Sequence, residues 1–314
     1  MRLGVLDVGS NTVHLLVVDA HHGAHPWPAY SEKAELRLAE RIGSDGELTK
    51  AGADALCEAA AKAHDSAANY KTEDFLAFAT SAVRDASNSA KVLRRVREET
   101  GVELQVLSGE AEAIMTFLAV RRWFGWSAGR LLVLDIGGGS LEIAGGINEE
   151  PDLAMSLPLG AGRLTRERLK VDRMADEAPD ADRVEALMEH VDKKIATVAA
   201  KLTDAGFDRP VCTSKTFRTL ARLAGAAPSA AGPRVRRTMT RRGLAQVLSF
   251  IRHIPASKLA AMEGVSTGRA HQILAGAVVA ESAMRQLDID EIDLCPWALR
   301  EGVILRRLDV LESA

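Results

Sequence analysis

Two segments of the chain each place an aspartate before a turn of small residues, and they lie 128 residues apart. The first is Asp7-Val8-Gly9-Ser10-Asn11, and the second is Asp135-Ile136-Gly137-Gly138-Gly139-Ser140. Successive amide groups in such a turn form a concave site for anions. A nearby carboxylate suits Mg²⁺, which prefers a few carboxylates together with phosphate oxygens. The pattern therefore predicts phosphate binding at Gly9, Ser10 and Asn11 and at Gly137, Gly138, Gly139 and Ser140.

The alternative is that Asp7 and Asp135 only hydrogen-bond the turns that follow them, as aspartate often does. Duplication of the whole element favours the functional interpretation. An apolar run precedes each aspartate and a second apolar stretch follows each turn, at 13–18 and at 141–144. This pattern is typical of a β-hairpin, and its repetition indicates two related domains.

Helices and strands are predicted to alternate between the two hairpins, which is typical of an α/β fold. We assign the domains to residues 1–124 and 125–314, with the boundary at the small-residue run 125–129, and the final helix is free to pack back on the first domain. The predicted helices cover residues 49–70, 81–100, 109–122, 184–203 and 241–253, and the predicted strands cover 74–79, 102–107, 153–158 and 210–213.

Composition describes an ordinary folded protein. The chain has 314 residues, 47% hydrophobic and 26% charged, with a formal net charge of −3. Such values exclude a disordered chain, and without an excess of positive charge we expect no nucleic-acid partner. No long apolar stretch predicts a membrane partner. Three widely spaced cysteines, Cys57, Cys212 and Cys295, fit neither a disulfide framework nor a CxxC metal site, so a cytoplasmic location is expected.

In several motifs the chain resembles the exopolyphosphatase and guanosine pentaphosphate phosphohydrolase (Ppx/GppA) family, within the actin, Hsp70 and sugar-kinase superfamily. The matching segments are 7–12, 79–88, 108–113, 135–142, 157–165, 268–270 and 299–302. The resemblance implies two actin-like (ribonuclease H-like) α/β domains with an active-site cleft between them. Longer family members add a C-terminal helical region related to HD phosphohydrolases, and we expect this chain to be a short form without it.

The activity that the resemblance implies is Mg²⁺-dependent release of terminal orthophosphate from linear inorganic polyphosphate. The alternative substrate is guanosine pentaphosphate (pppGpp), and a further alternative is a non-catalytic sensor of polyphosphate or ppGpp. A kinase of the same superfamily is disfavoured by segment 80–88. The resemblance also suggests Mn²⁺ as a substitute metal, K⁺ as an activator and a homodimer.

Thr80, Ser81 and Arg84 are predicted to bind phosphate. Thr80 and Ser81 close one strand and open a helix, where amides and hydroxyls suit an anion. Arg84 stands one turn further and can bind the same anion with two parallel hydrogen bonds. The alternative is a plain helix cap with a surface arginine, and the match to the family's phosphate-binding segment argues against it.

Glu112 is the predicted general base. The family usually carries two adjacent glutamates here, and Ala111 replaces the first, which leaves Glu112 aligned with the glutamate assigned to activate water. Glu110 is the competitor, but residues two apart on a helix do not share a face. Glu110 is better explained as an acidic partner of the helix dipole.

The predicted catalytic carboxylates besides Glu112 are Asp135 and Glu142, which are also the expected Mg²⁺ ligands, with Asp7 as a further candidate. Glu142 occupies the hairpin position that His14 occupies in the first repeat. The alternative for Glu142 is a solvent-facing strand residue, and for His14 we prefer a packed side chain.

Gly160 and Lys215 complete the predicted phosphate site. Gly160 lies in a small-residue turn before a helix. Lys215 stands in a turn that relatives fill with glycine, and its long cation should crowd a nucleoside and favour another phosphate, which argues for polyphosphate. A basic cluster at 234–242 either guides the distal chain or is a solvated face.

Overall fold

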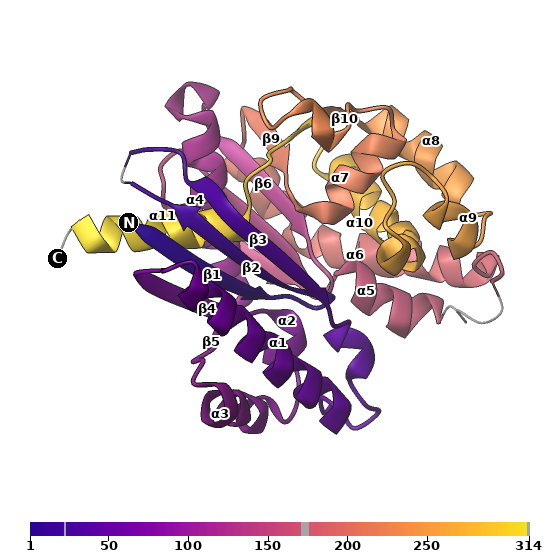
Figure 1. Cartoon of the computed structure of the whole chain (residues 1–314). Helices are drawn as coiled ribbons and strands as arrows, with labels where there is room; N and C mark the ends of the chain where they lie inside the picture. The colour runs from indigo at the N-terminus through magenta and orange to yellow at the C-terminus, as the bar shows by residue number, and fades with distance from the viewer. Residues whose placement is uncertain (22, 171–175, 313–314) are drawn as a thin grey trace. The chain divides into compact units, whose positions relative to one another are not determined.

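The computed structural model describes residues 1–21, 23–170 and 176–312. By its contacts the chain divides into two compact units, the first made of Met1–Met115 and Leu299–Ala314 and the second of Thr116–Ala298. Each unit contains one β-sheet with helices packed against it (Figure 1). The last helix thus belongs to the same unit as the N-terminal strands.

The first unit is built on a five-stranded sheet in the order β3-β2-β1-β4-β5. β1 and β2 form an antiparallel hairpin in which Asp7 lies opposite His14, and β4 runs parallel to β1. The strands are β1 (Arg2–Val8), β2 (Thr12–Asp19), β3 (Trp27–Glu35), β4 (Asp74–Ala79) and β5 (Gln105–Val106), and the main helices are α1 (Lys50–Asn69), α2 (Ser81–Arg84), α3 (Ser89–Thr100) and α11 (Leu299–Glu312). Helix α4 (Gly109–Phe124) begins in this unit and continues into the second unit from Thr116.

Alternate residues of β1 enter two separate hydrophobic cores. Leu6 and Val8 pack in a core with α1 and α3, whereas Leu3 and Val5 pack with Ile304 of α11 and its neighbours. A strand that is buried on both faces must be apolar along nearly its whole length. This explains why β1 reads as a continuous apolar run.

The second unit repeats this plan around a six-stranded sheet in the order β10-β11-β9-β6-β7-β8. The hairpin of β6 and β7 places Asp135 opposite Glu142, and β9 runs parallel to β6. The strands are β6 (Leu131–Ile136), β7 (Leu141–Gly146), β8 (Leu153–Leu157), β9 (Arg209–Cys212), β10 (Thr238–Thr240) and β11 (Glu291–Leu294), and the helices are α5 (Ala161–Leu164), α6 (Ala181–Ala205), α7 (Ser214–Leu223), α8 (Arg241–Ile251), α9 (Ala256–Ala260) and α10 (Ile273–Gln286).

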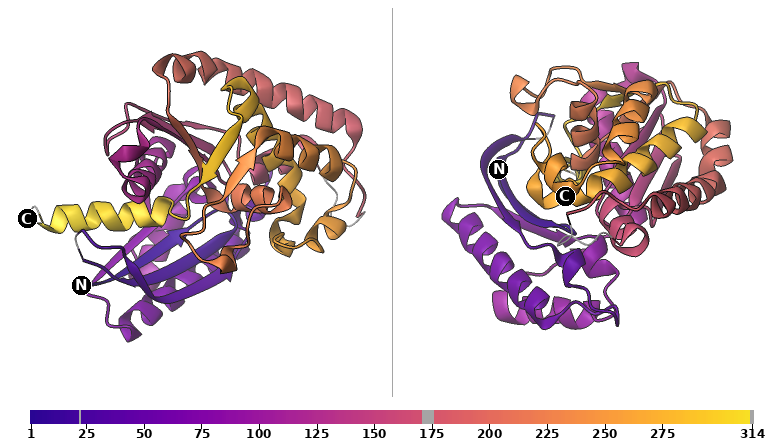
Figure 2. Two further views of the ribbon diagram at one scale, coloured as in Figure 1. Left: turned by 90° about the horizontal axis from the view of Figure 1, so that it is seen from above. Right: turned by 90° about the vertical axis from the view of Figure 1, so that its right-hand side faces the viewer.

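Helix α10 forms the centre of the second core. It is buried along most of its length and packs against both α6 and α8 (Figure 2). Its apolar side chains share one cluster with the inner faces of β6, β7 and β9. The hairpin that carries Asp135 therefore packs against a large buried core.

Both predicted hairpins are confirmed, and so are most helices and strands. The predicted helix over 81–100 is wrong, because the chain forms α2 and α3 with a break between them. At the break, the side-chain amide of Asn88 accepts from the Leu48 amide at 2.9 Å and donates to the Leu48 carbonyl at 3.0 Å. The predicted strand over 102–107 shrinks to the two residues of β5, and the edge strand β3 was not predicted.

Gly302 is required where α11 crosses α4. A Cβ atom on Gly302 would lie 1.9 Å from the carbonyl oxygen of Met115, far closer than any real contact. We expect Gly302→Ala to lower the free energy of unfolding by about 1–3 kcal/mol, because the helices must move apart. Urea denaturation measures this loss. Gly145→Ala is the control, since its added Cβ meets nothing nearer than 3.6 Å; equal stability of Gly302→Ala and the native chain would contradict the prediction.

Candidate active site

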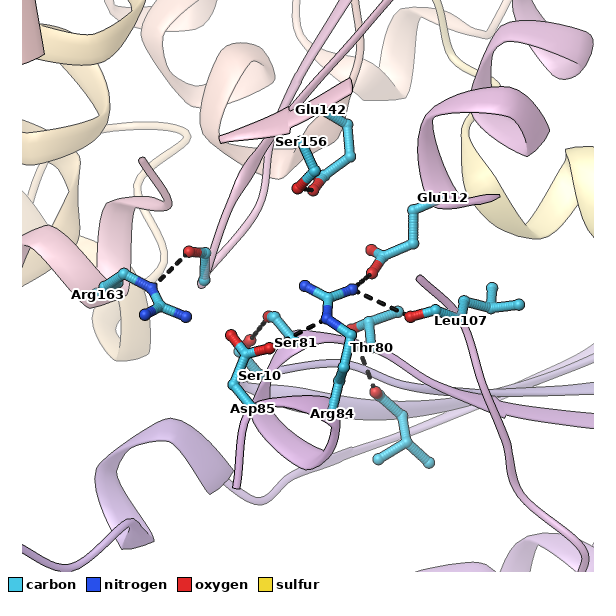
Figure 3. Close-up of polar contacts among 12 residues, drawn as sticks. Ser10, Thr80, Ser81, Arg84, Asp85, Leu107, Glu112, Glu142, Ser156 and Arg163 are labelled. Carbon is cyan, nitrogen blue, oxygen red and sulfur yellow. Dashed lines mark hydrogen bonds and ion pairs between the residues drawn. The ribbon is translucent and has the colours of Figure 1, made fainter. Parts of the chain in front are cut away.

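The first hairpin turn is closed by a backbone hydrogen bond from the Gly9 amide to the Thr12 carbonyl, 3.0 Å long. Behind the turn, the Thr80 amide donates to the Val8 carbonyl at 3.1 Å, which holds the start of α2 next to the end of β1. The hydroxyls of Ser10 and Ser81 lie 2.8 Å apart (Figure 3). The structure thus brings together two predicted phosphate-binding segments whose contacting serines are 71 residues apart in sequence.

Arg84 and Glu112 form an ion pair in the first unit (Figure 3). Nη1 of Arg84 contacts the Glu112 carboxylate and also donates to the Leu107 carbonyl at 3.1 Å, while Nε donates to Asp85 at 3.0 Å. Burial lowers the pKa of Arg84, but the charges of Glu112 and Asp85 outweigh it and raise that pKa above its ordinary value. A permanently charged guanidinium therefore stands beside the carboxylate predicted to act as base.

The start of α4 determines where Glu112 points. Ser108 caps the helix, since its hydroxyl accepts from the Ala111 amide at 3.1 Å. Glu112 is buried, with 7% of its surface exposed, whereas Glu110 in the same turn is exposed. Of the two glutamates, Glu112 is the one directed inward, to Arg84.

The second hairpin turn repeats the first, with a hydrogen bond from the Gly137 amide to the Ser140 carbonyl at 2.9 Å. All three glycine carbonyls are occupied from behind. Gly137 O accepts from the Ala161 amide, Gly138 O from the Arg163 amide and Gly139 O from Arg163 Nε, at 2.8–3.0 Å. Among the described residues, the amides of Gly138, Gly139 and Ser140 make no hydrogen bond. These donors are available for an anion.

Gly160 packs directly against this turn. A Cβ atom at Gly160 would lie 2.2 Å from the carbonyl carbon of Gly139, so only glycine allows α5 to approach and bind the turn carbonyls. The structure therefore gives Gly160 a packing role. Its direct contact with phosphate stays a prediction.

Asp135 and Glu142 face each other across the second hairpin, each with a hydroxyl donor. Thr213 Oγ1 donates to Asp135, and Ser156 Oγ donates to Glu142 at 2.8 Å (Figure 3 shows the latter pair). Glu142 is only 5% exposed, so it is not the solvent-facing strand residue of the alternative interpretation. His14, its counterpart, is buried and hydrogen-bonded to Ser31, as the packed interpretation predicts.

These two carboxylates fit a magnesium ion that takes its other ligands from substrate and water. Within the described ranges, no group of three or more His, Cys, Asp or Glu side chains is arranged to hold a metal ion. Mg²⁺ is commonly bound by one or two carboxylates plus substrate phosphates. Asp135 and Glu142 are two carboxylates of the kind that such a partial site needs, and Mg²⁺ binding there stays a prediction.

Sequence reasoning missed Thr213 as a partner of Asp135. The signal was present, because Thr213-Ser214 follows β9 and opens α7 just as Thr80-Ser81 follows β4 and opens α2. Ser214 has a φ of 74°, a left-handed conformation that costs a non-glycine residue free energy. This agrees with the expectation that the turn is usually glycine-rich. Lys215 follows it as an exposed residue in the first turn of α7.

Burial raises the pKa of Asp135, opposed by the Thr213 hydrogen bond and the charges of Arg218 and Arg269. The unfolded chain then ionises at lower pH than the folded chain, so Asp135 reduces stability as pH rises above its ordinary pKa of 3.8. With a chelator present, we expect Asp135→Asn to raise Tm at about pH 7 and to raise it less at about pH 4.5. Calorimetry at both pH values measures this; a lower Tm at pH 7 would contradict it.

Comparisons with known proteins agree over the whole chain. The profile of the Ppx/GppA phosphatase family matches residues 17–311. Exopolyphosphatase 1 of Mycobacterium tuberculosis is 59% identical over 310 residues, covering 98% of this chain and 89% of that protein. A guanosine-5′-triphosphate,3′-diphosphate pyrophosphatase of Vibrio parahaemolyticus is 28% identical, covering 98% of this chain and 59% of that protein.

Solved structures share the fold. The Aquifex aeolicus PPX-GPPA enzyme matches with a TM-score of 0.80 at 25% identity, covering 98% of this chain and 99% of that one. An exopolyphosphatase of Cytophaga hutchinsonii matches with a TM-score of 0.87 at 22% identity, covering 99% and 98%. The predicted α/β class with two related, actin-like units is confirmed, while the predicted cleft stays a prediction.

In the described part of the chain, no helix is long and apolar enough to cross a membrane. The chain belongs to the Ppx/GppA phosphatase family and is a hydrolase of that family.

Proposed function

We propose that this chain is an exopolyphosphatase that releases terminal orthophosphate from linear inorganic polyphosphate. The observation that carries the chemistry is the pairing of Arg84 with Glu112, because it joins a phosphate-binding cation to a carboxylate that can accept a proton from water. The substrate is inferred from the relatives, since the proteins named Exopolyphosphatase 1 are 57–59% identical to the chain.

In the proposed reaction, Glu112 accepts a proton as water attacks the terminal phosphorus. A bond forms between the water oxygen and phosphorus, and the anhydride bond to the rest of the chain breaks. Arg84 exchanges part of its contact with Glu112 for a contact with the phosphoryl oxygens, whose charge it stabilises. The amides of Gly138, Gly139 and Ser140, which make no hydrogen bond to the described residues, bind further phosphate oxygens of the substrate.

Asp135 and Glu142 would hold Mg²⁺, which supplies positive charge that neutralises the phosphate oxygens. Thr213 and Ser156 keep the two carboxylates oriented by donating to them. Asp7 lies in the first hairpin, opposite the buried His14, and its part in metal binding stays a prediction. Mn²⁺ substitution, activation by K⁺, a homodimer and a cytoplasmic location also stay predictions.

Guanosine pentaphosphate is the second candidate substrate, favoured by the match to the Vibrio pyrophosphatases over nearly the whole chain. Polyphosphate is preferred because Lys215, an exposed residue in the first turn of α7, should crowd a nucleoside and favour another phosphate. Phosphate release from both substrates, measured in parallel with Mg²⁺, decides between them. Release from guanosine pentaphosphate alone would overturn the preference, and binding without release from either would favour a sensor.

We expect Glu112→Gln to lower kcat by about 10²–10⁴-fold with little change in substrate binding. Glutamine keeps an oxygen that accepts from Arg84 but cannot take the proton from water. Steady-state phosphate release measures the effect. Glu110→Gln, an exposed residue in the same helical turn, is the matched control and should retain native kcat. Native turnover in Glu112→Gln would remove Glu112 from the mechanism.

We expect Glu142→Gln to raise the Mg²⁺ concentration needed for half-maximal activity by about tenfold or more, because one of two carboxylate ligands is lost. A titration of phosphate release against free Mg²⁺ measures this. His14→Gln changes the equivalent position of the first hairpin and should leave the Mg²⁺ requirement as it is. The metal assignment fails if both variants respond to Mg²⁺ like the native chain.

A further inference from the structure

The second unit contains a cavity of about 230 Å³ beside helix α7. Four of its lining side chains are cationic and one is anionic. Three of the cations, Lys215, Arg218 and Arg222, stand at spacings of three and four residues, so they share one face of α7. The lining residues are Lys215, Arg218, Arg222, Ala226, Ala227, Pro228, Ser229, Arg237, Glu263, Gly264 and Leu294.

One of the arginines holds in place the loop that forms a wall of this cavity. Arg237 donates to the carbonyls of Ala227, Val235, Pro228 and Gly232 at 2.7–3.0 Å, which folds the loop over 226–233 around its guanidinium. A cavity whose walls are fixed in this way is pre-organised for a ligand.

The only carboxylate in the lining is already engaged. Arg222 contacts Glu263 at 2.7 Å and also donates to the Ala226 carbonyl at 3.1 Å. The hydrogen bond and the charge of Arg222 lower the pKa of Glu263, so this residue is anionic and balances Arg222. The lining therefore carries three more cationic than anionic side chains, four against one.

Arg218 is the lining arginine whose hydrogen-bond donors are most available to a ligand. It is partly buried, and it makes no hydrogen bond or ion pair with the described residues. A guanidinium carries five N–H donors and suits bidentate binding of phosphate. Its position in a cavity wall therefore indicates an anion-binding site.

The cavity lies near the second hairpin. Lys215 follows Thr213 by two residues, and Thr213 donates to Asp135. Arg218 is also close enough to Asp135 for its charge to act on that carboxyl group. A polyanion held at the turn of Gly137–Gly139 thus has a cationic path along α7 toward the cavity.

Two arginines of the basic cluster at 234–242 are paired with acidic residues. Arg236 is paired with Asp293 and Glu291, and Arg241 with Asp290 and Asp288. The charges of these two arginines are balanced by carboxylates of the protein, which favours the interpretation of this cluster as a structural and solvated face. Arg237, which lines the cavity, belongs to the same stretch.

We propose that this cavity is a second phosphate-binding subsite, which holds an inner segment of a linear polyphosphate whose terminal phosphate lies at the hairpin turns. The proposal rests on the proposed exopolyphosphatase function. The subsite determines affinity for long chains and takes no part in bond cleavage.

The lining favours phosphate groups over a nucleoside. None of the residues that line the cavity is aromatic, so a base would find no ring to stack on. None carries an amide side chain, and Glu263 is taken by Arg222, which leaves Ser229 as the uncharged side-chain hydrogen-bonding group. The excess of positive charge in the lining, four cationic side chains against one carboxylate, matches a polyanion instead.

The test is direct binding of size-fractionated long polyphosphate and of guanosine pentaphosphate, by calorimetry with EDTA present so that turnover does not interfere. Arg218→Gln removes a cation from the wall, and its matched control Arg234→Gln removes one from an exposed position outside the lining. Ser229→Asp adds a carboxylate to the lining. Its control, Ala230→Asp, adds the same charge one residue further on, outside it. Thermal melts confirm that each variant is folded.

We expect Arg218→Gln and Ser229→Asp to raise the Kd for long polyphosphate by about tenfold, with small changes in both controls. In the turnover assay, KM for long polyphosphate should rise by a similar factor while kcat changes by less than about twofold.

Unchanged Kd in Arg218→Gln and Ser229→Asp would overturn the subsite. So would equal losses in the controls, which would indicate general charge attraction, or a loss confined to guanosine pentaphosphate, which would indicate a nucleoside pocket. If the native chain shows the expected binding pattern but releases no phosphate, the subsite stands and the proposed function fails.

Discussion

A single backbone hydrogen bond, made once in each unit, determines the geometry of both hairpin turns. It runs from the Gly9 amide to the Thr12 carbonyl and from the Gly137 amide to the Ser140 carbonyl. Because side chains alternate along a strand, a turn one residue longer would send every residue of the returning strand to the opposite face. The bond therefore decides that Asp135 lies opposite Glu142, and that the turn carries a run of amides between them.

In both units the turn's carbonyls are bound by the segments that follow. Ser10 O accepts from Ala39, Asn11 O accepts from Leu36 and Arg37, and the carbonyls of Gly137–Gly139 accept from Ala161 and Arg163. Buried polar groups must be paired, and this arrangement pairs the acceptors of both turns. In the second turn it leaves the amides of Gly138, Gly139 and Ser140 without a hydrogen bond to the described residues. Gly160 makes this arrangement possible, since any side chain there would push α5 away from the turn.

The two units have diverged in what their equivalent positions carry. The second hairpin has two carboxylates, Asp135 and Glu142, whereas the first has Asp7 and a buried His14 bonded to Ser31. The first unit instead supplies the ion pair of Arg84 and Glu112. The two repeated hairpins thus carry different groups, and we propose that the second unit binds the metal ion while the first handles the proton, which fits the hydrolase chemistry of the family.

The amino-acid sequence by itself determined the two hairpins, the aspartates at the ends of their first strands, the α/β pattern and the family, because tight turns and apolar periodicity are local. It did not determine the break before Asn88, which depends on hydrogen bonds to Leu48, or the short β5. Only the tertiary structure decided that Thr213 orients Asp135, that Glu112 rather than Glu110 meets Arg84, and that Gly160 is a packing residue. Each of these depends on residues far apart in sequence, whose contacts no local pattern specifies.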